Sequence, residues 1–488
     1  MIFINSLQSL LIEFYLSLTI IILLIYSIVN NKYIIVKNVS ILSILAIIFA
    51  IIILNTNPYT YIITFNNAFI TDNFSSIIKL IVLVGSLSSI IISLDYLKDQ
   101  KIYSYEYILL VLLSTVAMLF LTSAYNLISI YLAIELQSLS FYVLASMKKN
   151  SEYSTEASFK YFILGVFSSG FLLLGFTILY GFTGIINIEQ FYKLFVCFEN
   201  FDNFSLISIS LGILLIVMSF LFKIGAVPFH MWLPDVYEGS PMSVTAFFAI
   251  TPKIVILSLI FRIFIYAFYE VIYDINNIFI YCSIASMILA SIAGLYQSRI
   301  IRLFAYSAIG HIGYMLIGVA VGSIEAISAV LFYMIIYIVM SIGIYSIIIS
   351  IRTKDKSIEI KYLKELIGLS KNNPLLSISF AMILFSMAGI PPLAGFFSKL
   401  YLFASAMNAN MFNLALIGIL TSVIGTVYYI YIIRLMYFEK TNSWLYFVQI
   451  NKPLSMLIGS TLIVLLLLFI YASSILVYTH QLALLLTI

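Results

Sequence analysis

Charged side chains are scarce in this chain, and their scarcity excludes most classes of protein. Lysine, arginine, aspartate and glutamate make up 9% of the 488 residues, whereas 63% of the residues are hydrophobic and the mean hydropathy is +1.14. So few charges cannot cover the surface of a water-soluble globule of this length. The formal net charge of +4 is also too small to indicate a nucleic-acid-binding surface, and we expect no nucleic-acid partner.

Residues that commonly bind metals are equally rare. The chain has two cysteines, Cys197 and Cys282, and three histidines, His230, His311 and His480. None of them stands at the spacing of a zinc or iron–sulfur site. No glycine-rich fingerprint follows a predicted strand, so the sequence offers no nucleotide or flavin site. We therefore expect no cofactor and no metal on this chain.

Long apolar runs recur along the whole chain, and each is close to the roughly 20 residues with which a helix crosses a bilayer. The alternation of apolar and polar residues that is typical of a membrane β-barrel is absent. The first run contains Glu13 and lacks both a basic start and a small-residue cleavage site. It therefore predicts a spanning helix rather than a signal peptide. We expect Glu13 to lie close enough to the membrane interface for its carboxylate to remain hydrated.

Hydropathy predicts an all-α integral membrane protein with about fourteen transmembrane helices. The predicted spans are 7–29, 39–56, 74–94, 105–122, 124–146, 159–182, 206–228, 241–269, 278–296, 302–322, 326–351, 373–404, 413–437 and 454–478.

Basic residues in the loops and at the adjoining ends of the spans support this count. Eighteen of them lie on one face, in or beside alternate loops, and only Lys193 lies in the opposite loops. Such an imbalance is typical of membrane proteins, and a missed or additional helix in the middle of the chain would destroy it. Both termini are therefore predicted on the face opposite the basic loops.

Five basic residues remain inside the spans, where a charge costs at least about 2.5–3.5 kcal/mol on insertion scales. Lys79 and Arg262 lie near helix ends, and we interpret them as side chains that snorkel to the interface. Lys223, Lys253 and Lys399 lie too deep for that interpretation. A kinked structural helix with a lysine paired for packing would explain one such residue, but three of them favour a polar pathway.

Proline and glycine interrupt the spans beside these lysines. Lys223 precedes Ile224-Gly-Ala-Val-Pro228, Lys399 follows Gly389-Ile-Pro-Pro-Leu-Ala-Gly395, and Lys253 directly follows a proline. Broken helices are tolerated in membranes where the freed backbone groups line a water-filled cavity or an ion path. We therefore predict broken helices near Lys223 and Lys399.

Glu135 is the only acidic residue deep within the middle spans, and we expect it on a continuous helix. Pairing across the bundle is the usual way to lower the cost of two buried charges. A nearby carboxylate favours the charged form of a lysine, and its departure favours release of the proton. We therefore predict an ion pair between Glu135 and Lys223.

An internal repeat is also predicted. The shift in sequence that carries Lys223 onto Lys399 also carries Glu135 onto His311, the only histidine deep in a span. Each half would hold five helices, and because five is odd the halves must be inverted in the membrane. The predicted division is an N-terminal three-helix segment (1–100), a first five-helix repeat (101–276), a second five-helix repeat (277–440) and a C-terminal helix (441–488).

Five stretches of the sequence carry further information. They are Tyr131-Leu-Ala-Ile-Glu-Leu-Gln-Ser-Leu, Ser154-Thr-Glu-Ala-Ser-Phe-Lys-Tyr-Phe, Phe222-Lys-Ile-Gly-Ala-Val-Pro-Phe-His-Met-Trp-Leu-Pro-Asp-Val-Tyr-Glu-Gly-Ser-Pro, Ala305-Tyr-Ser-Ala-Ile-Gly-His-Ile-Gly-Tyr and Gly389-Ile-Pro-Pro-Leu-Ala-Gly-Phe-Phe-Ser-Lys. These stretches resemble the antiporter-like membrane subunits of respiratory complex I, the NADH:ubiquinone oxidoreductase. The resemblance covers nearly the whole chain. Lys399 and the Glu-Leu-Gln-Ser sequence are similar to the subunit 2 branch of that family, in its longer form.

The resemblance implies a fourteen-helix fold with two inverted five-helix repeats, and proton translocation driven by quinone reduction elsewhere in the complex. By motif, it places a proton relay at Glu135, Lys223, Lys253 and Lys399, with His311 as a further member. It implies that NADH, FMN, iron–sulfur clusters and ubiquinone bind to other subunits. The implied partners are other membrane-arm subunits and membrane lipids.

Two other interpretations stay open, namely a subunit of a related multi-subunit cation/proton antiporter and a non-pumping scaffold of the membrane arm. Lys399 and the Glu-Leu-Gln-Ser sequence favour complex I over the first, and the intact set of four interior charges argues against the second. Heavy use of isoleucine, with 39 Phe, 36 Tyr and many Asn, suggests an AT-rich coding genome. Together with the resemblance, this composition favours the mitochondrial inner membrane, with a bacterial plasma membrane or a plastid membrane as alternatives.

Overall fold

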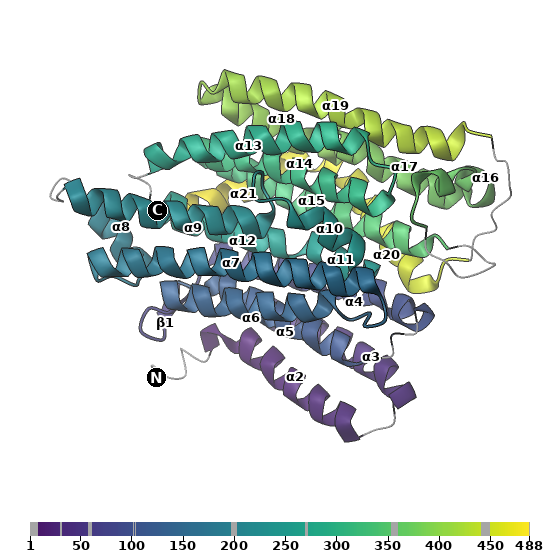
Figure 1. Ribbon diagram of the computed structural model, residues 1–488, viewed down its shortest axis with the longest axis horizontal. Coiled ribbons are helices and arrows are strands. Elements are labelled where there is room, and N and C mark those ends of the chain that lie inside the picture. The colour runs from purple at the N-terminus through teal and green to yellow at the C-terminus, as the bar shows by residue number, and fades with distance from the viewer. Residues whose placement is uncertain are drawn as a thin grey trace.

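The computed structural model describes residues 8–29, 32–56, 61–100, 102, 104–196, 203–268, 272–352, 360–440 and 449–487. These residues form one bundle of helices whose long axes run in roughly the same direction (Figure 1). The helices lie nearly horizontal in this view, so the two ends of the bundle are at the left and the right of the picture.

The helices and strands follow one another in three groups along the chain. The first group is α2 (Leu11–Val29), α3 (Lys32–Thr56), β1 (Ile62–Thr64), β2 (Phe69–Thr71) and α4 (Asn73–Asp99). The second is α5 (Glu106–Ser123), α6 (Leu127–Ala145), α7 (Glu152–Thr183), α8 (Ile188–Val196), α9 (Asn203–Ile224), α10 (Trp232–Gly239), α11 (Met242–Ile250), α12 (Pro252–Ile260) and the π-helix η2 (Phe261–Ala267). The third is α13 (Ile272–Leu295), α14 (Ile300–Val321), α15 (Ile324–Ser350), η3 (Leu363–Leu366), α16 (Leu369–Asn372), α17 (Pro374–Ala388), α18 (Ala394–Asn408), α19 (Phe412–Tyr437), α20 (Lys452–Ile470) and α21 (Ala472–Thr487).

The all-α membrane fold is confirmed. In the described part of the chain, 13 helices are long and apolar enough to cross a membrane. The predicted span 373–404 is not among them, because it consists of two shorter helices, α17 and α18, on either side of a break. Together these two helices supply the remaining one of the fourteen predicted spans.

Two other predicted spans are divided as well. The span 241–269 contains α11, α12 and η2, and the division falls at Pro252. Proline begins a helix readily because its missing N–H would have no intrahelical partner there. The span 454–478 is divided at Tyr471, between α20 and α21.

The orientation of the bundle agrees with the topology predicted from the basic loops. Helix α2 begins and α21 ends at the left of Figure 1, at the same end as β1 and α8. Helices α10 and α16 lie toward the opposite end (Figure 1). Helix α16, whose last turn contains Lys371, therefore lies away from the end where the first helix starts.

Polar side chains satisfy the backbone where the helices begin. Asp72 precedes α4, where its side chain accepts a hydrogen bond from the backbone N–H of Ser75 at 2.7 Å, and Ser75 Oγ accepts from the N–H of Asp72 at 3.0 Å. Asn126 and Ser129 form the same reciprocal cap at α6. Such caps matter in an apolar environment, because an unpaired N–H group in hydrocarbon costs several kcal/mol.

The centre of the bundle includes two helices that carry predicted site residues, α12 with Lys253 and α14 with His311. Helices α11, α12, α14 and α15 are almost entirely buried by the other helices. Helices α2, α3 and α20 lie at the periphery and leave most of their surface exposed. Lys253 of α12 and His311 of α14 are therefore shielded from both lipid and bulk water.

Candidate functional site

The first predicted break follows Lys223. Helix α9 ends at Ile224, and Gly225 has a left-handed backbone conformation with a φ of +78°. The backbone angle favours glycine, and a Cβ atom at this position would lie 2.5 Å from Cδ1 of Leu233, so that side chain would have to move. Helix α10 resumes at Trp232. Lys223 thus lies in the last turn of α9, directly before a helix break, as predicted.

The indole of Trp232 stabilises this break. Its Nε1 donates a hydrogen bond to the carbonyl oxygen of Phe222 at 3.0 Å. The N–H of Gly225, the first residue after α9, donates to the same carbonyl at 3.0 Å, so this oxygen accepts two hydrogen bonds at the break. The same helix end carries partial negative charge, which favours the ammonium group of Lys223.

The second predicted break precedes Lys399. Helix α17 ends at Ala388, Gly389 has a φ of +83°, and α18 begins at Ala394. The Nζ of Lys399 donates to the carbonyl oxygens of Met387 at 3.0 Å and Ala388 at 2.9 Å. These carbonyls are among the last of α17, so they lack intrahelical donors. The ammonium group replaces the missing donors.

The two lysines do not occupy equivalent positions. Lys223 ends the helix before its break, whereas Lys399 lies in the helix after its break. The left-handed glycines Gly225 and Gly389 are therefore closer together in the sequence than the two lysines are. The predicted alignment of the two halves is wrong, because it matches a lysine that precedes one helix break with a lysine that follows the other. The two inverted repeats stay a prediction, which the recurrence of the break supports.

Lys253 is a buried amine surrounded by aromatic rings. It follows Pro252 at the start of α12 and is 3% exposed. Its Nζ lies 5.4 Å from the ring centre of Tyr237 and 5.9 Å from that of Tyr337. Among the described residues, this Nζ has no hydrogen-bond partner. Cation–π contacts with the two rings partly replace the lost hydration.

Glu135 lies in the middle of α6, which is continuous, as predicted. Ser138 Oγ lies 3.4 Å from Oε2, and Oε1 has no hydrogen-bond partner in the described part of the chain. No Nζ–Oε distance of 4.0 Å or less joins the described side chains of Lys223 and Glu135, so the predicted contact ion pair is absent. Glu135 is half-buried on the side of α6 that also carries the exposed Leu132 and Leu139. Its Oε1 is nevertheless buried, and its Oε2 lies against Ser138.

A cavity joins the surroundings of these three charged residues. It is lined by Lys223, Lys253 and aromatic rings, and α6 contributes Gln137 and Ser138 to it. Ser138 also contacts Glu135, so the carboxylate lies next to the cavity. A cavity with several polar groups in its lining can hold a water molecule, which mediates contacts between groups too far apart to bond directly.

His311 faces the polar interior, as predicted, and is 2% exposed. Its Nδ1 lies 2.6 Å from the hydroxyl oxygen of Tyr333, and its Nε2 lies 3.4 Å from that of Tyr429. A second cavity is lined by His311, Lys399 and Tyr314, together with other polar residues. Imidazole with a partner on each nitrogen can accept a proton on one side and donate on the other.

Tyrosine rings connect the lysines to His311. The ring of Tyr337 lies 5.9 Å from the Nζ of Lys253 and 5.5 Å from the ring of His311. The ring of Tyr314 lies 6.3 Å from that of His311 and 5.2 Å from the Nζ of Lys399. The order through the second half of the site is therefore Lys253, Tyr337, His311, Tyr314 and Lys399.

Sequence reasoning missed most of these tyrosines. Tyrosine usually marks the ends of spans, where its hydroxyl reaches the interface. Tyr333 and Tyr337 lie instead one turn apart in the middle of α15, and both are buried. Two tyrosines in the middle of a span could have indicated a polar interior, because a buried hydroxyl group needs a polar partner.

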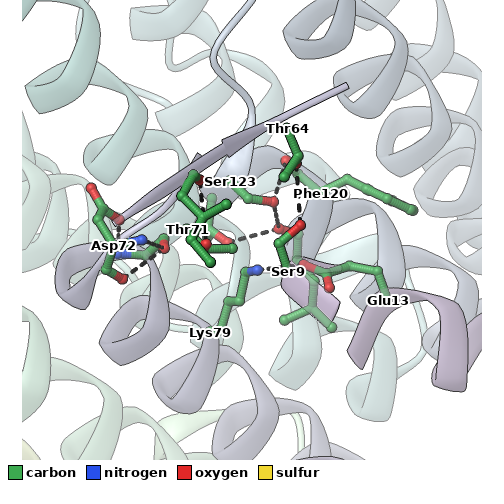
Figure 2. A network of polar contacts seen from close by, with 12 residues as sticks. Ser9, Glu13, Thr64, Thr71, Asp72, Lys79, Phe120 and Ser123 are labelled. Carbon is green, nitrogen blue, oxygen red and sulfur yellow. Dashed lines mark hydrogen bonds and ion pairs between the residues drawn. The ribbon is translucent and has the colours of Figure 1, made fainter. Parts of the chain in front are cut away.

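Lys79 and Arg262 do not snorkel, contrary to the prediction. Each is 3% exposed. Lys79 Nζ lies 2.5 Å from Oε1 of Glu13 (Figure 2). An Nη of Arg262 lies 2.6 Å from Oδ2 of Asp72. The prediction that Glu13 stays wet is also wrong, because its side chain is fully buried. Both errors come from treating each helix end alone, whereas packing places each cation opposite an acid from another part of the chain.

A network of ion pairs fixes α10 after the first break. Asp235 pairs with Lys160 of α7 at 3.2 Å and with Arg302 of α14 at 2.9 Å. Glu238 pairs with Arg299 and with Arg302. These side chains are partly exposed, so each pair contributes less than about 1 kcal/mol to stability. Their combined effect is to position α10 between α7 and α14.

The groups brought together at this site are all titratable. Lysine, glutamate, histidine and tyrosine side chains each bind and release a proton. No group of three or more His, Cys, Asp or Glu side chains in the described ranges could hold a metal ion. The arrangement therefore suits the movement of protons along a buried row of titratable side chains, which we call the file.

Comparison with known proteins identifies the family. Residues 124–425 match the family described as "NADH:quinone oxidoreductase/Mrp antiporter, TM". The chain is 45% identical to "NADH-ubiquinone oxidoreductase chain 2" of Marchantia polymorpha over 472 residues, which is 95% of each chain. It is 43% identical to "NADH-quinone oxidoreductase subunit N" of Methylobacterium nodulans over 382 residues, which is 78% of each chain.

A solved structure shares the fold. A chain of respiratory complex I from Thermus thermophilus superimposes with a TM-score of 0.80 and 24% sequence identity, covering 95% of this chain and 98% of that one. The family match covers more than half of this chain, and the similarity to the relatives extends over most of its length. The chain therefore belongs to the NADH:quinone oxidoreductase/Mrp antiporter family of membrane proteins.

Proposed function

We propose that this chain translocates protons as a membrane-arm subunit of an NADH:quinone oxidoreductase. The observation that carries the proposal is the file of proton-exchanging groups between two helix breaks, from Lys223 through Lys253 and His311 to Lys399. The relatives named as subunits of that enzyme support the choice of complex.

The proton enters the file at Lys223. The negative charge of Glu135, acting through the cavity, favours the protonated form of Lys223. When that charge is neutralised or screened, a protonated amine in an apolar bundle becomes costly to keep. Lys223 then releases its proton toward Lys253, which lines the same cavity.

Lys253 and Lys399 are suited to different steps. Lys253 has no hydrogen bond to lose among the described residues, so it can accept and release a proton without leaving a partner unpaired. The protonated form of Lys399 is stabilised by two carbonyl oxygens at the end of α17, which makes it a group that holds the proton. His311, between them, passes the proton from one to the other.

The driving energy comes from quinone reduction in other subunits. We propose that NADH, FMN, iron–sulfur clusters and ubiquinone bind there, and that this chain binds neither cofactor nor metal. Its partners would be neighbouring membrane-arm subunits and lipids. Its amino-acid composition suggests an AT-rich coding genome. This composition and its similarity to a Marchantia relative support a location in the mitochondrial inner membrane, with the basic loops facing the matrix.

Purification of the intact complex from its host through a tag on this chain tests the proposal. The complex should contain flavin, reduce quinone with NADH, and acidify or alkalinise the lumen of proteoliposomes during turnover. A complex without flavin that exchanges sodium or potassium ions for protons would contradict the proposal and support the antiporter alternative. Turnover without any contribution of this chain to proton movement would indicate a scaffold.

A further inference from the structure

Two buried ion pairs lie within two turns of each other on α4, outside the file described above. Glu13 of α2 lies 2.5 Å from the Nζ of Lys79, and the two side chains are 0% and 4% exposed. Asp72, at the start of α4, pairs with Arg262 at 2.6 Å. Figure 2 shows Lys79 and Glu13 pointing toward each other next to the hairpin, with Asp72 near the start of the same helix.

The pair of Asp72 and Arg262 has the bonds of a structural contact. Oδ1 of Asp72 accepts from the N–H of Ser75 at 2.7 Å, and Oδ2 accepts from Arg262. Arg262 also donates to the carbonyl oxygen of Thr122 at 2.9 Å. A guanidinium group does not release its proton in proteins. These bonds tie α4, α5 and η2 together.

The pair of Glu13 and Lys79 lacks such bonds. Apart from the ammonium of Lys79, neither carboxylate oxygen of Glu13 has a hydrogen-bond partner in the described part of the chain. A buried ion pair with few other bonds is weak evidence for stability, because apolar side chains of similar size often pack as well. Unlike an arginine pair, these two groups can neutralise each other by transferring one proton.

Two hydroxyl groups lie near this pair, toward the hairpin end of the bundle. Ser9 lies one helical turn before Glu13, and its Oγ is 3.1 Å from Oγ1 of Thr64 on β1 (Figure 2). The hairpin turn that follows Thr64, at residues 65–67, is exposed. A hydroxyl group both accepts and donates hydrogen bonds, so it can pass a proton between a carboxylate and water.

The other side of α4 packs against the proposed proton file. Gly85 approaches Thr251 so closely that a Cβ on Gly85 would lie 2.5 Å from its Cγ2. Thr251 is two residues from Lys253. Ser86, which is fully buried, lies on the same face of α4 as Lys79, two turns further along. Helix α4 thus joins the N-terminal pair to the lysine file.

We propose that Glu13 and Lys79 are further proton-transfer residues, which exchange protons between the file and the hairpin end of the bundle; this inference rests on the proposed function. The ammonium of Lys79 transfers its proton to the carboxylate of Glu13, and both groups become neutral. The carboxylic acid then releases the proton through the hydroxyls of Ser9 and Thr64. A proton that arrives from the file restores the ammonium, and a carboxylate again faces it.

The test replaces the pair in the complete complex, reconstituted in proteoliposomes, and measures protons translocated per quinone reduced. Glu13→Leu combined with Lys79→Met should assemble and should lower this ratio to the level of Lys223→Ala. Lys79→Arg keeps a cation beside Glu13 but does not release a proton, so it should lower the ratio equally. As a matched control, Asp72→Asn combined with Arg262→Met should reduce the amount of assembled complex, because structural bonds are lost.

The outcomes separate the inference from the proposed function. A normal ratio in the Glu13 and Lys79 variants, with a lowered ratio in Lys223→Ala, would overturn the inference alone. A normal ratio in Lys223→Ala as well would contradict the proposed function. If the double variant does not assemble, Lys79→Arg decides: a lowered ratio supports the inference, and a normal ratio overturns it.

Discussion

The hydroxyl group of Tyr333 lies 2.6 Å from Nδ1 of His311, deep in the second half of the bundle. This hydrogen bond fixes the orientation of the imidazole and leaves Nε2 directed toward the cavity that also contains Lys399. A change at Tyr333 should therefore disturb proton transfer without removing any titratable group of the lysine file.

Tyr333→Phe should lower this chain's contribution to the protons translocated per quinone reduced by roughly fivefold. One hydrogen bond contributes about 1 kcal/mol, which corresponds to a factor of about five. Tyr345→Phe is the matched control on the same helix, because the buried hydroxyl of Tyr345 has no hydrogen-bond partner among the described residues. It should leave the flux unchanged. Equal flux in the two variants would show that the bond to His311 does not matter for transfer.

Lys253→Met and Lys399→Met should differ in stability although both should stop transfer. Lys253→Met removes an amine without a bonded partner and should leave the thermal stability of the complex unchanged or slightly raised. Lys399→Met leaves the carbonyls of Met387 and Ala388 without a donor and should cost about 1–3 kcal/mol. Thermal denaturation of the two purified complexes makes the comparison, and equal midpoints would contradict it.

Gly225→Ala should impair assembly more than Gly322→Ala. Both positions have positive φ, +78° and +67°, where an alanine costs about 1–2 kcal/mol. Only at position 225 would the new Cβ also lie 2.5 Å from Leu233; at position 322 the nearest atom, the carbonyl oxygen of Val319, is 3.9 Å away. The amount of assembled complex in membranes should therefore fall further for Gly225→Ala, and equal amounts would show that the approach of Leu233 is unimportant.

Local sequence features predicted the spans and the breaks. Apolar runs and the distribution of basic loops were enough for the topology, because membrane helices satisfy their own backbone groups. The breaks beside Lys223 and Lys399 followed from glycine and proline, whose effects on a helix do not depend on distant residues.

Contacts between distant parts of the chain could not be predicted in the same way. The ion pair of Lys79 with Glu13 joins residues from α2 and α4, and no local pattern indicates which acid a buried lysine will meet. The same limit explains the absent contact between Glu135 and Lys223, which depends on the rotation of α6 against α9. It also explains the wrong register between the two halves, which relied on residue type rather than on the backbone.

If the buried lysines move protons, loss of the Lys223 amine in Lys223→Ala should lower the number of protons translocated per quinone reduced. The complete complex carrying this substitution should be reconstituted in proteoliposomes, and protons translocated per quinone reduced should be measured against assembled complex. We predict normal assembly with a lower ratio, because the first amine of the file is lost. Glu135→Asp should keep more of the ratio than Glu135→Ala, since it keeps the negative charge near the cavity. A ratio in Lys223→Ala equal to that of the unchanged complex would contradict the account.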